Sequence, residues 1–316
     1  MIEKMTDEEA TILALKQWEK SFERSFKHIT FEDKLQKAIN ELVDTNPSEI
    51  IKWGWDMWDN TLWWIYGGKI YVIWAESWHW KSTFVNQVAM NLSRQKVKVT
   101  KYSLEDRMED IWKEELFYSC NRIRYSNKLP AYEWTKFVNN EYWNNNSIFF
   151  DMDFAQILEF AFNDLKKLSI TELDKTKNVK IDDLIRLMEE EVKAGTKVFI
   201  IDHLHYFKMD SDARRDLEIE NIMHSINEIA RKYNVAVFLV AHYSKLHWQE
   251  PSNDSFKDAS AVKQVANIII HIVRNKDNFT TDFKFWKMRW PIKCDWFTAS
   301  FDLRTYTYKN FTNLII

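Results

Sequence analysis

Glycine is scarce in this sequence. A globular chain of 316 residues would carry about 22 glycines at the usual frequency of roughly 7%. This chain has 4 glycines and 16 tryptophans. The two numbers together come close to the expected glycine count, so many of the tryptophans stand where glycines are expected.

Cysteine is also rare, and no long apolar run is present. Cys120 and Cys294 are far apart in the sequence, which excludes a disulfide framework and gives no metal-ligand spacing. The N-terminal stretch MIEKMTDEEATILALKQWEK has early acids and no apolar core, and no later stretch reaches the length of a membrane span. The net charge of -3 argues against a globally basic surface but leaves room for a basic channel. We expect a cytoplasmic protein without a membrane partner.

Two parts are expected along the chain. Residues 1–46 form a helical N-terminal segment, in which an apolar stripe at helical spacing predicts a docking helix. The stripe consists of Phe31, Leu35, Ala38, Ile39 and Leu42. Asn46, Pro47 and Ser48 then interrupt the pattern, so the main domain is predicted to span residues 47–316.

Short apolar runs alternate with helical patterns in the main domain. Strands are predicted at residues 69–73, 97–103, 197–201 and 235–240, with an amphipathic helix between the last two. This order predicts an α/β fold with a mostly parallel sheet and crossover helices. Past residue 265, three closely spaced runs predict an antiparallel extension at the sheet edge. Residues 120–147 are interpreted as helix and loop without chemistry.

The stretch VIWAESWHWKSTF, residues 72–84, ends in Lys-Ser-Thr between a predicted strand and a predicted helix. With Trp taken as Gly, residues 74–83 become GAESGHGKST, which fits the phosphate-binding pattern (A/G)xxxxGK(S/T). Only glycine allows the close approach of this backbone to phosphates. Lys81 would contact the terminal phosphates, Ser82 would hold Mg²⁺, and Thr83 would line the phosphate pocket. The whole predicted nucleotide-binding loop comprises Ala75, Glu76, Ser77, Trp78, His79, Trp80, Lys81, Ser82 and Thr83.

The alternative interpretation is an ordinary helix start, capped by Ser82 or Thr83, with core tryptophans around it. One observation argues against this interpretation: taking Trp as Gly also gives plausible turns elsewhere in the sequence. TLWWIYGGKIY becomes TLGGIYGGKIY, and KMRWP becomes KMRGP.

Further polar residues follow predicted strands. Asp202 ends the run KVFIID, where a carboxylate can hold Mg²⁺, although a turn residue is the simpler interpretation. Glu105 follows the strand 97–103 and could activate a water molecule, or be a solvated helix-start residue. His242 ends the run VAVFLVAH, where it is either functional or a surface histidine. Lys287 and Arg289 are two residues apart in FWKMRW, so their side chains share one face of a strand. They are either solvated or reach a phosphate on a neighbouring subunit.

Taken together, residues 47–310 resemble the RecA-like ATPase domain of DnaB-type replicative helicases. The segments that carry the resemblance are AESWHWKST, YSLEDRMEDI, VFIIDHLHYF, FLVAHYSKL and KMRWP, in family order. The resemblance implies ATP and Mg²⁺ as cofactors, Glu105 as catalytic carboxylate and Asp202 as the Walker B residue. It also implies His242 as phosphate sensor, and Lys287 with Arg289 as a finger pair acting on the next subunit.

The resemblance further implies a ring, usually a hexamer, with single-stranded DNA in its channel and a possible primase or loader as partner. Two loops would face the channel, and their basic residues would track phosphates without reading sequence, unless they are solvated surface charges. These residues are Lys208, Arg214, Arg215, Lys245 and Lys257. The stripe in residues 31–42 resembles the linker helix that docks on a neighbouring subunit.

The tryptophans admit two interpretations. In the first, the gene uses UGA for glycine and has been translated with UGA as tryptophan, at Trp63, Trp64, Trp74, Trp78, Trp80 and Trp290. In the second, the tryptophans are real and the protein is a nucleotide-dead structural or interaction subunit. A third functional hypothesis is a RecA-like or KaiC-like ATPase without unwinding activity.

Overall fold

The computed structural model describes residues 35–36, 50–62, 64–75, 81–103, 108–148, 150–173, 180–202, 215–242, 260–275, 278–288, 296–303, 305 and 307–313. The chain divides into two units, Met1–Ile50 and Ile51–Ile316. In the first unit only residues 35–36 and 50 are described, so the predicted apolar stripe lies largely outside the described residues. The domain boundary predicted after residue 46 stays a prediction.

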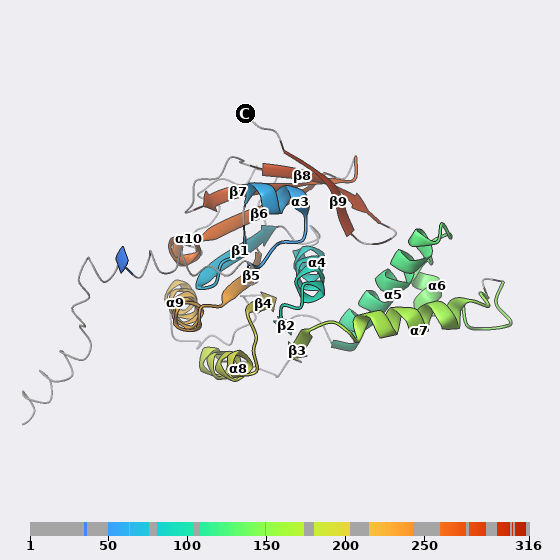
Figure 1. The fold of residues 1–316 in the computed structure, drawn as a ribbon, viewed down its shortest axis with the longest axis horizontal. Coiled ribbons are helices and arrows are strands. Elements are labelled where there is room, and N and C mark those ends of the chain that lie inside the picture. Colours follow the sequence, from blue (N-terminus) through green and yellow to red (C-terminus); the bar gives the residue numbers. More distant parts are fainter. Residues whose placement is uncertain are drawn as a thin grey trace, which may run out of the picture. The chain divides into compact units, whose positions relative to one another are not determined.

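The described strands form one nine-stranded sheet, in the order β3-β2-β4-β5-β1-β6-β7-β8-β9 (Figure 1). The parallel strands are β1 (Lys69–Ala75), β2 (Val99–Ser103), β3 (Ile170–Leu173), β4 (Val198–Asp202), β5 (Ala236–His242) and β6 (Ile268–Asn275). The antiparallel strands are β7 (Thr280–Met288), β8 (Trp296–Asp302) and β9 (Thr307–Asn313). The predicted α/β fold, with a mostly parallel sheet and antiparallel C-terminal strands, is confirmed.

One part of the strand prediction is wrong. The run that begins at residue 267 was expected to open the antiparallel extension, but β6 pairs parallel with β1. The chain reaches β6 through α10 (Ser260–Val265) after β5, and a crossover of this kind delivers a parallel strand. The continuous apolar run Ile268–Ile270 also suits a strand buried on both faces. The antiparallel extension therefore begins at β7.

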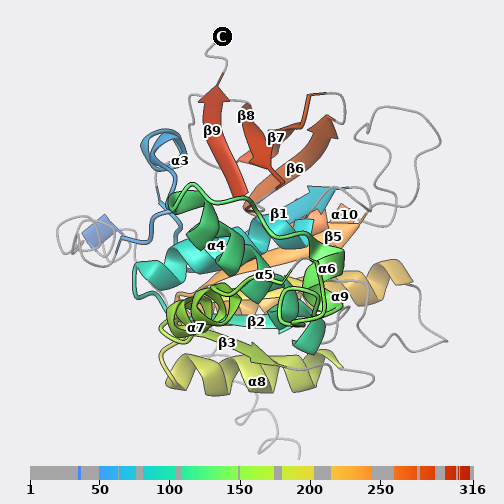
Figure 2. The ribbon, with the colours of Figure 1, turned by 90° about the vertical axis from the view of Figure 1, so that its right-hand side faces the viewer.

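Helices cover both faces of the sheet (Figure 2). On one face, α3 (Asp56–Thr61) and α4 (Lys81–Arg94) share a hydrophobic cluster with the strands. On the other face, α8 (Ile181–Lys193), α9 (Arg215–Tyr233) and α10 share a second cluster. The stripe predicted for α9 is confirmed, because its apolar positions from Ile219 to Ile229 are buried in this second cluster.

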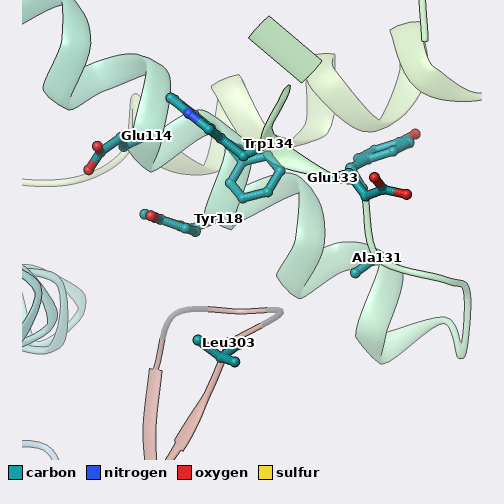
Figure 3. Close-up of a pocket in the computed structure, with 8 residues that line it drawn as sticks. Glu114, Tyr118, Ala131, Glu133, Trp134 and Leu303 are labelled. Atoms are coloured by element: carbon teal, nitrogen blue, oxygen red, sulfur yellow. The ribbon is translucent and has the colours of Figure 1, made fainter. Parts of the chain in front are cut away.

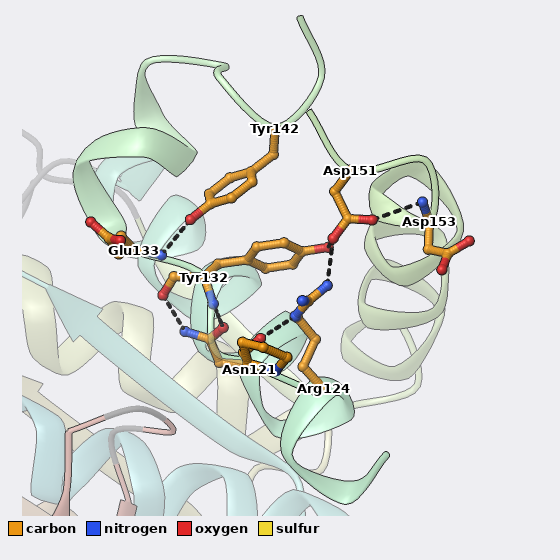
Figure 4. A network of polar contacts seen from close by, with 8 residues as sticks. Asn121, Arg124, Tyr132, Glu133, Tyr142, Asp151 and Asp153 are labelled. Atoms are coloured by element: carbon orange, nitrogen blue, oxygen red, sulfur yellow. Dashed lines mark hydrogen bonds and ion pairs between the residues drawn. The ribbon is translucent and has the colours of Figure 1, made fainter. Parts of the chain in front are cut away.

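A helical lobe lies between β2 and β3 in the sequence. It consists of α5 (Met108–Ser126), α6 (Trp134–Val138) and α7 (Phe154–Leu165), and it has its own small aromatic core. Asp151 ties the lobe together, since its carboxylate accepts hydrogen bonds from Arg124 at 2.5 Å and from the Tyr132 hydroxyl at 3.1 Å (Figure 4). Residues 120–147 are thus helix and loop, as predicted. Within the described parts of the chain, no helix is long and apolar enough to cross a membrane.

Candidate nucleotide site

Three of the predicted site residues, Ala75, Asp202 and His242, end parallel strands at one edge of the sheet. β1, β2, β4 and β5 are parallel, so their carboxyl ends lie together. Ala75 at the end of β1 is in register with His242 at the end of β5. Ser103 at the end of β2 is in register with Asp202 at the end of β4. This edge is where open α/β sheets bind ligands.

Strand alternation places three of these residues on the face that α4 covers. Ala75 and Ile200 belong to the hydrophobic cluster shared with α4, as does Val99. Because side chains two apart along a strand share a face, Asp202 follows Ile200 on that side and Ser103 follows Val99. The carboxylate and the hydroxyl therefore lie on the same side of the sheet as the first turn of α4.

Lys81 begins α4 directly beside this edge. Its side chain is buried, with 6% exposure, and Nζ donates a hydrogen bond to the carbonyl oxygen of Ala75 at 3.3 Å. Ser82 and Thr83 follow in the first turn and are half-buried. The ammonium group is thus held at the end of β1, where the positive end of the α4 dipole also favours an anion.

The described residues fit a magnesium nucleotide. Asp202 is buried, with 6% exposure. Ser103 Oγ is buried and has no hydrogen-bond partner among the described residues. Carboxylate and hydroxyl oxygens are the ligands that Mg²⁺ prefers, and Lys81 supplies the positive charge that phosphates require. The loop residues from Glu76 to Trp80 lie outside the described part of the chain.

Trp74 does not crowd this edge. Its side chain is 3% exposed and packs in the cluster on the opposite face, with Ala241 and Val262 and beside Trp286. Trp74 therefore fills the core under α9 and α10. Trp78 and Trp80 lie outside the described residues.

The remaining predicted residues are only partly described. Lys287 lies on β7, and its Nζ donates hydrogen bonds to the carbonyl oxygens of Lys263 and of Gln264, the latter at 3.1 Å. Both carbonyls belong to the last turn of α10, so Lys287 caps a helix of its own chain. Arg215 begins α9, and its side chain lies outside the described residues. So do Glu105, Arg289, Lys208, Arg214, Lys245 and Lys257.

Two features were not predicted from the sequence. Ser103 stands two residues before Glu105 in the stretch YSLEDR, and that spacing was the available signal. A pocket of about 500 Å³ lies between the helical lobe and Leu303 (Figure 3). It is lined by Glu114, Phe117, Tyr118, Ala131, Tyr132, Glu133, Trp134 and Leu303. None of these residues belongs to the predicted site.

The sheet order, the helix-covered faces and the polar residues at the carboxyl edge define a RecA-like ATPase domain. The family model of the DnaB-like helicase C-terminal domain matches residues 51–288, and the chain belongs to this family. The predicted resemblance is thereby confirmed.

Two solved structures have the same fold. The first is an isolated ATPase domain, with a TM-score of 0.72 and 16% identity over 88% of this chain and 98% of that one. The second is a DnaB-like replicative helicase described together with its interactions with primase. It gives a TM-score of 0.70 and 15% identity, over 88% of this chain and 66% of that one. A comparison with curated proteins gives no match.

Proposed function

We propose that this protein is an ATP-dependent DNA helicase motor that forms a ring and moves along single-stranded DNA during replication. The observation that carries the proposal is that Lys81, bonded to the Ala75 carbonyl at the end of β1, and Asp202, at the end of β4, lie at the same carboxyl edge of the sheet, in a chain of the DnaB-like helicase family. ATP and Mg²⁺ are the proposed cofactors. Bound MgATP supplies the phosphoanhydride bond whose hydrolysis drives movement.

Each residue of the site has a proposed role in binding or hydrolysing ATP. Lys81 exchanges the Ala75 carbonyl for phosphate oxygens, and Ser82 with Asp202 holds the metal ion. Glu105 orients and deprotonates the attacking water. His242 senses the terminal phosphate. Arg289 and Lys287 of a neighbouring subunit stabilise the charge that develops there, for which Lys287 must leave the α10 carbonyls.

Self-association is supported by the surface of the helical lobe. Large apolar side chains are exposed there, among them Trp143 at 51%, Ile148 at 91% and Met152 at 86%. Contiguous exposed apolar surface marks interaction sites. In the proposed ring, the basic residues Lys208, Arg214, Arg215, Lys245 and Lys257 line the channel and track DNA phosphates. A primase or loader is a further proposed partner.

The proposal includes glycine at positions 78 and 80, and also at 63, 64 and 290, whereas Trp74 fills the core and the proposed loop does not need glycine there. A decayed site would not be expected to replace glycine by one residue type throughout. The codons of the gene test this directly. UGA codons at these positions support the proposal, whereas UGG codons at Trp78 and Trp80 would leave a loop that rejects phosphate.

The activity is tested with the full chain carrying Trp78→Gly and Trp80→Gly. We expect Mg²⁺-dependent ATP hydrolysis that single-stranded DNA stimulates and that Lys81→Ala abolishes. Strand separation is then measured on a forked duplex. Hydrolysis that does not respond to DNA would favour a RecA-like ATPase without unwinding, and an absence of hydrolysis would favour the nucleotide-dead subunit.

A further inference from the structure

The Ser103 hydroxyl differs from other buried hydroxyls near it. Ser103 is 7% exposed, and its Oγ has no hydrogen-bond partner among the described residues. On the same strand, Thr100 Oγ1 pairs with Glu191 at 3.0 Å and with Thr196 at 2.8 Å. Most buried polar side-chain atoms are paired, so an orphaned hydroxyl calls for an explanation such as an ion or a water molecule.

The surroundings of Ser103 indicate what the hydroxyl is for. Ser103 is in register with Asp202, on strands that lie about 4.8 Å apart, and both side chains lie on the face covered by α4. Glu105 follows two residues later in the chain. The orphaned hydroxyl therefore lies on the strand next to the residue proposed to hold the metal ion, and the residue proposed to activate water follows it closely in the sequence.

We propose that Ser103 is a positioning residue of the nucleotide site, whose hydroxyl hydrogen-bonds a water molecule of the Mg²⁺ shell beside Asp202. The inference rests on the proposed function and deepens it. Mg²⁺ gives up its waters reluctantly, so a site with few carboxylates must hold the hydrated ion through outer contacts. Removing such an outer contact typically weakens metal binding by 10–100-fold.

The test compares Ser103→Ala with its parent, the full chain carrying Trp78→Gly and Trp80→Gly. Mn²⁺ binding in the presence of ADP is followed by electron paramagnetic resonance. We expect the metal dissociation constant to rise about 10-fold, with metal-free ADP affinity and the melting temperature unchanged, because the hydroxyl has no hydrogen-bond partner among the described residues. Ser103→Thr restores a hydroxyl and should return the metal affinity to within about threefold of the parent.

Thr100→Val is the matched control on the same strand. It removes a hydroxyl that is paired within the protein, so it should lower the melting temperature and leave the metal affinity unchanged. Parent-like metal affinity in Ser103→Ala overturns the inference, and so does a lower melting temperature without weaker metal binding. A parent that binds no ADP with or without metal overturns the proposed function itself, and this is seen before any Ser103 variant is made.

Discussion

At the scale of single residues, Gln87 links α4 to β9, the edge strand of the sheet. Its Nε2 donates to the Tyr308 carbonyl at 3.3 Å, and the Tyr308 N–H donates to its Oε1 at 2.7 Å. Tyr308 is only 1% exposed, so Gln87→Ala leaves two buried backbone groups unpaired. We expect a loss of about 1–3 kcal/mol in the free energy of unfolding, measured by urea denaturation.

Gln95, directly after the same helix, provides the control for Gln87. Its carboxamide accepts from the Lys52 N–H at 3.3 Å and donates to the Lys52 carbonyl at 2.9 Å. These bonds are exposed, so water replaces them in Gln95→Ala, and the loss should stay under about 1 kcal/mol. Equal losses in the two variants would show that burial of the strand edge is not the cause.

Trp58 is expected to be a true tryptophan. It is fully buried and packs against Phe84, Phe283 and Phe297, with ring centroids 5.2–5.5 Å apart. Trp58→Ala opens a large cavity and should cost about 3–5 kcal/mol. Trp58→Phe should cost less, because the indole N–H has no hydrogen-bond partner within the described residues. Thermal denaturation measures both variants.

Trp143, which is 51% exposed, is the control for Trp58. Trp143→Ala should change the stability by about 0.5 kcal/mol or less, as for most surface substitutions. Since glycine would leave a still larger cavity than alanine at position 58, we expect a UGG codon there. A tolerated Trp58→Ala together with a UGA codon would place this residue among the displaced glycines.

At the scale of elements, the helical lobe contains a buried thiol. Cys120 on α5 is fully buried, and burial raises the pKa of its thiol to about 12. Below pH 9 the thiol is protonated in both the folded and the unfolded state. Above the pKa of the unfolded chain, near 9, only the unfolded thiol ionises. The folded state should therefore lose about 1 kcal/mol per pH unit from this group between about pH 9 and pH 12.

Cys120→Ala removes this titration. The difference in unfolding free energy between parent and variant, measured by denaturation at several pH values, should be constant below about pH 9 and shrink above it. Parallel curves across the whole range would show that Cys120 is solvated in the folded protein.

Most strands could be predicted because burial dictates their composition. β1, β4 and β5 lie inside the sheet with helices on both faces, so their sequences are continuous apolar runs. β3 is a four-residue edge strand, Ile170–Leu173, and so short a run carries no readable period. The order of the strands was not predicted either, since it depends on which crossovers pack together and not on any single segment.

Part of the candidate site could be predicted from the sequence, because some charged residues stand at or shortly after the end of a predicted strand. Asp202 ends an apolar run and Lys81 stands in a Lys-Ser-Thr sequence shortly after another, and the parallel sheet then brings the strand ends to one edge. Ser103 was missed because its position two residues before Glu105 does not by itself show that its hydroxyl is buried at the strand end. The contact of Lys287 with α10 was missed because it joins segments more than 20 residues apart through a long side chain.

At the scale of the whole molecule, the sheet and the lobe have different surfaces. Both faces of the parallel sheet are covered by helices, and its core is closed. The segment between α6 and α7 exposes large apolar side chains, with Ile148 and Met152 the most exposed of the described large apolar residues. Exposed apolar surface can mark an interaction site, so we propose this segment of the lobe as a subunit contact in the proposed ring.

Ile148→Asp and Met152→Asp, made together, should therefore weaken assembly without harming the nucleotide site. In the chain carrying Trp78→Gly and Trp80→Gly, we expect the distribution of masses, measured by sedimentation velocity, to shift from the proposed ring toward single subunits, while ADP affinity changes less than about twofold. Phe279→Asp is the matched control. Phe279 is 49% exposed and lies on a hairpin turn, where its backbone φ is 55°. Asp tolerates this left-handed conformation better than Phe does. Because this turn is not part of the apolar segment between α6 and α7, the control should assemble like the parent.

Equal dissociation in both variants would mean that charge alone disrupts assembly. Unchanged assembly in the double variant would exclude this segment of the lobe from the subunit contact.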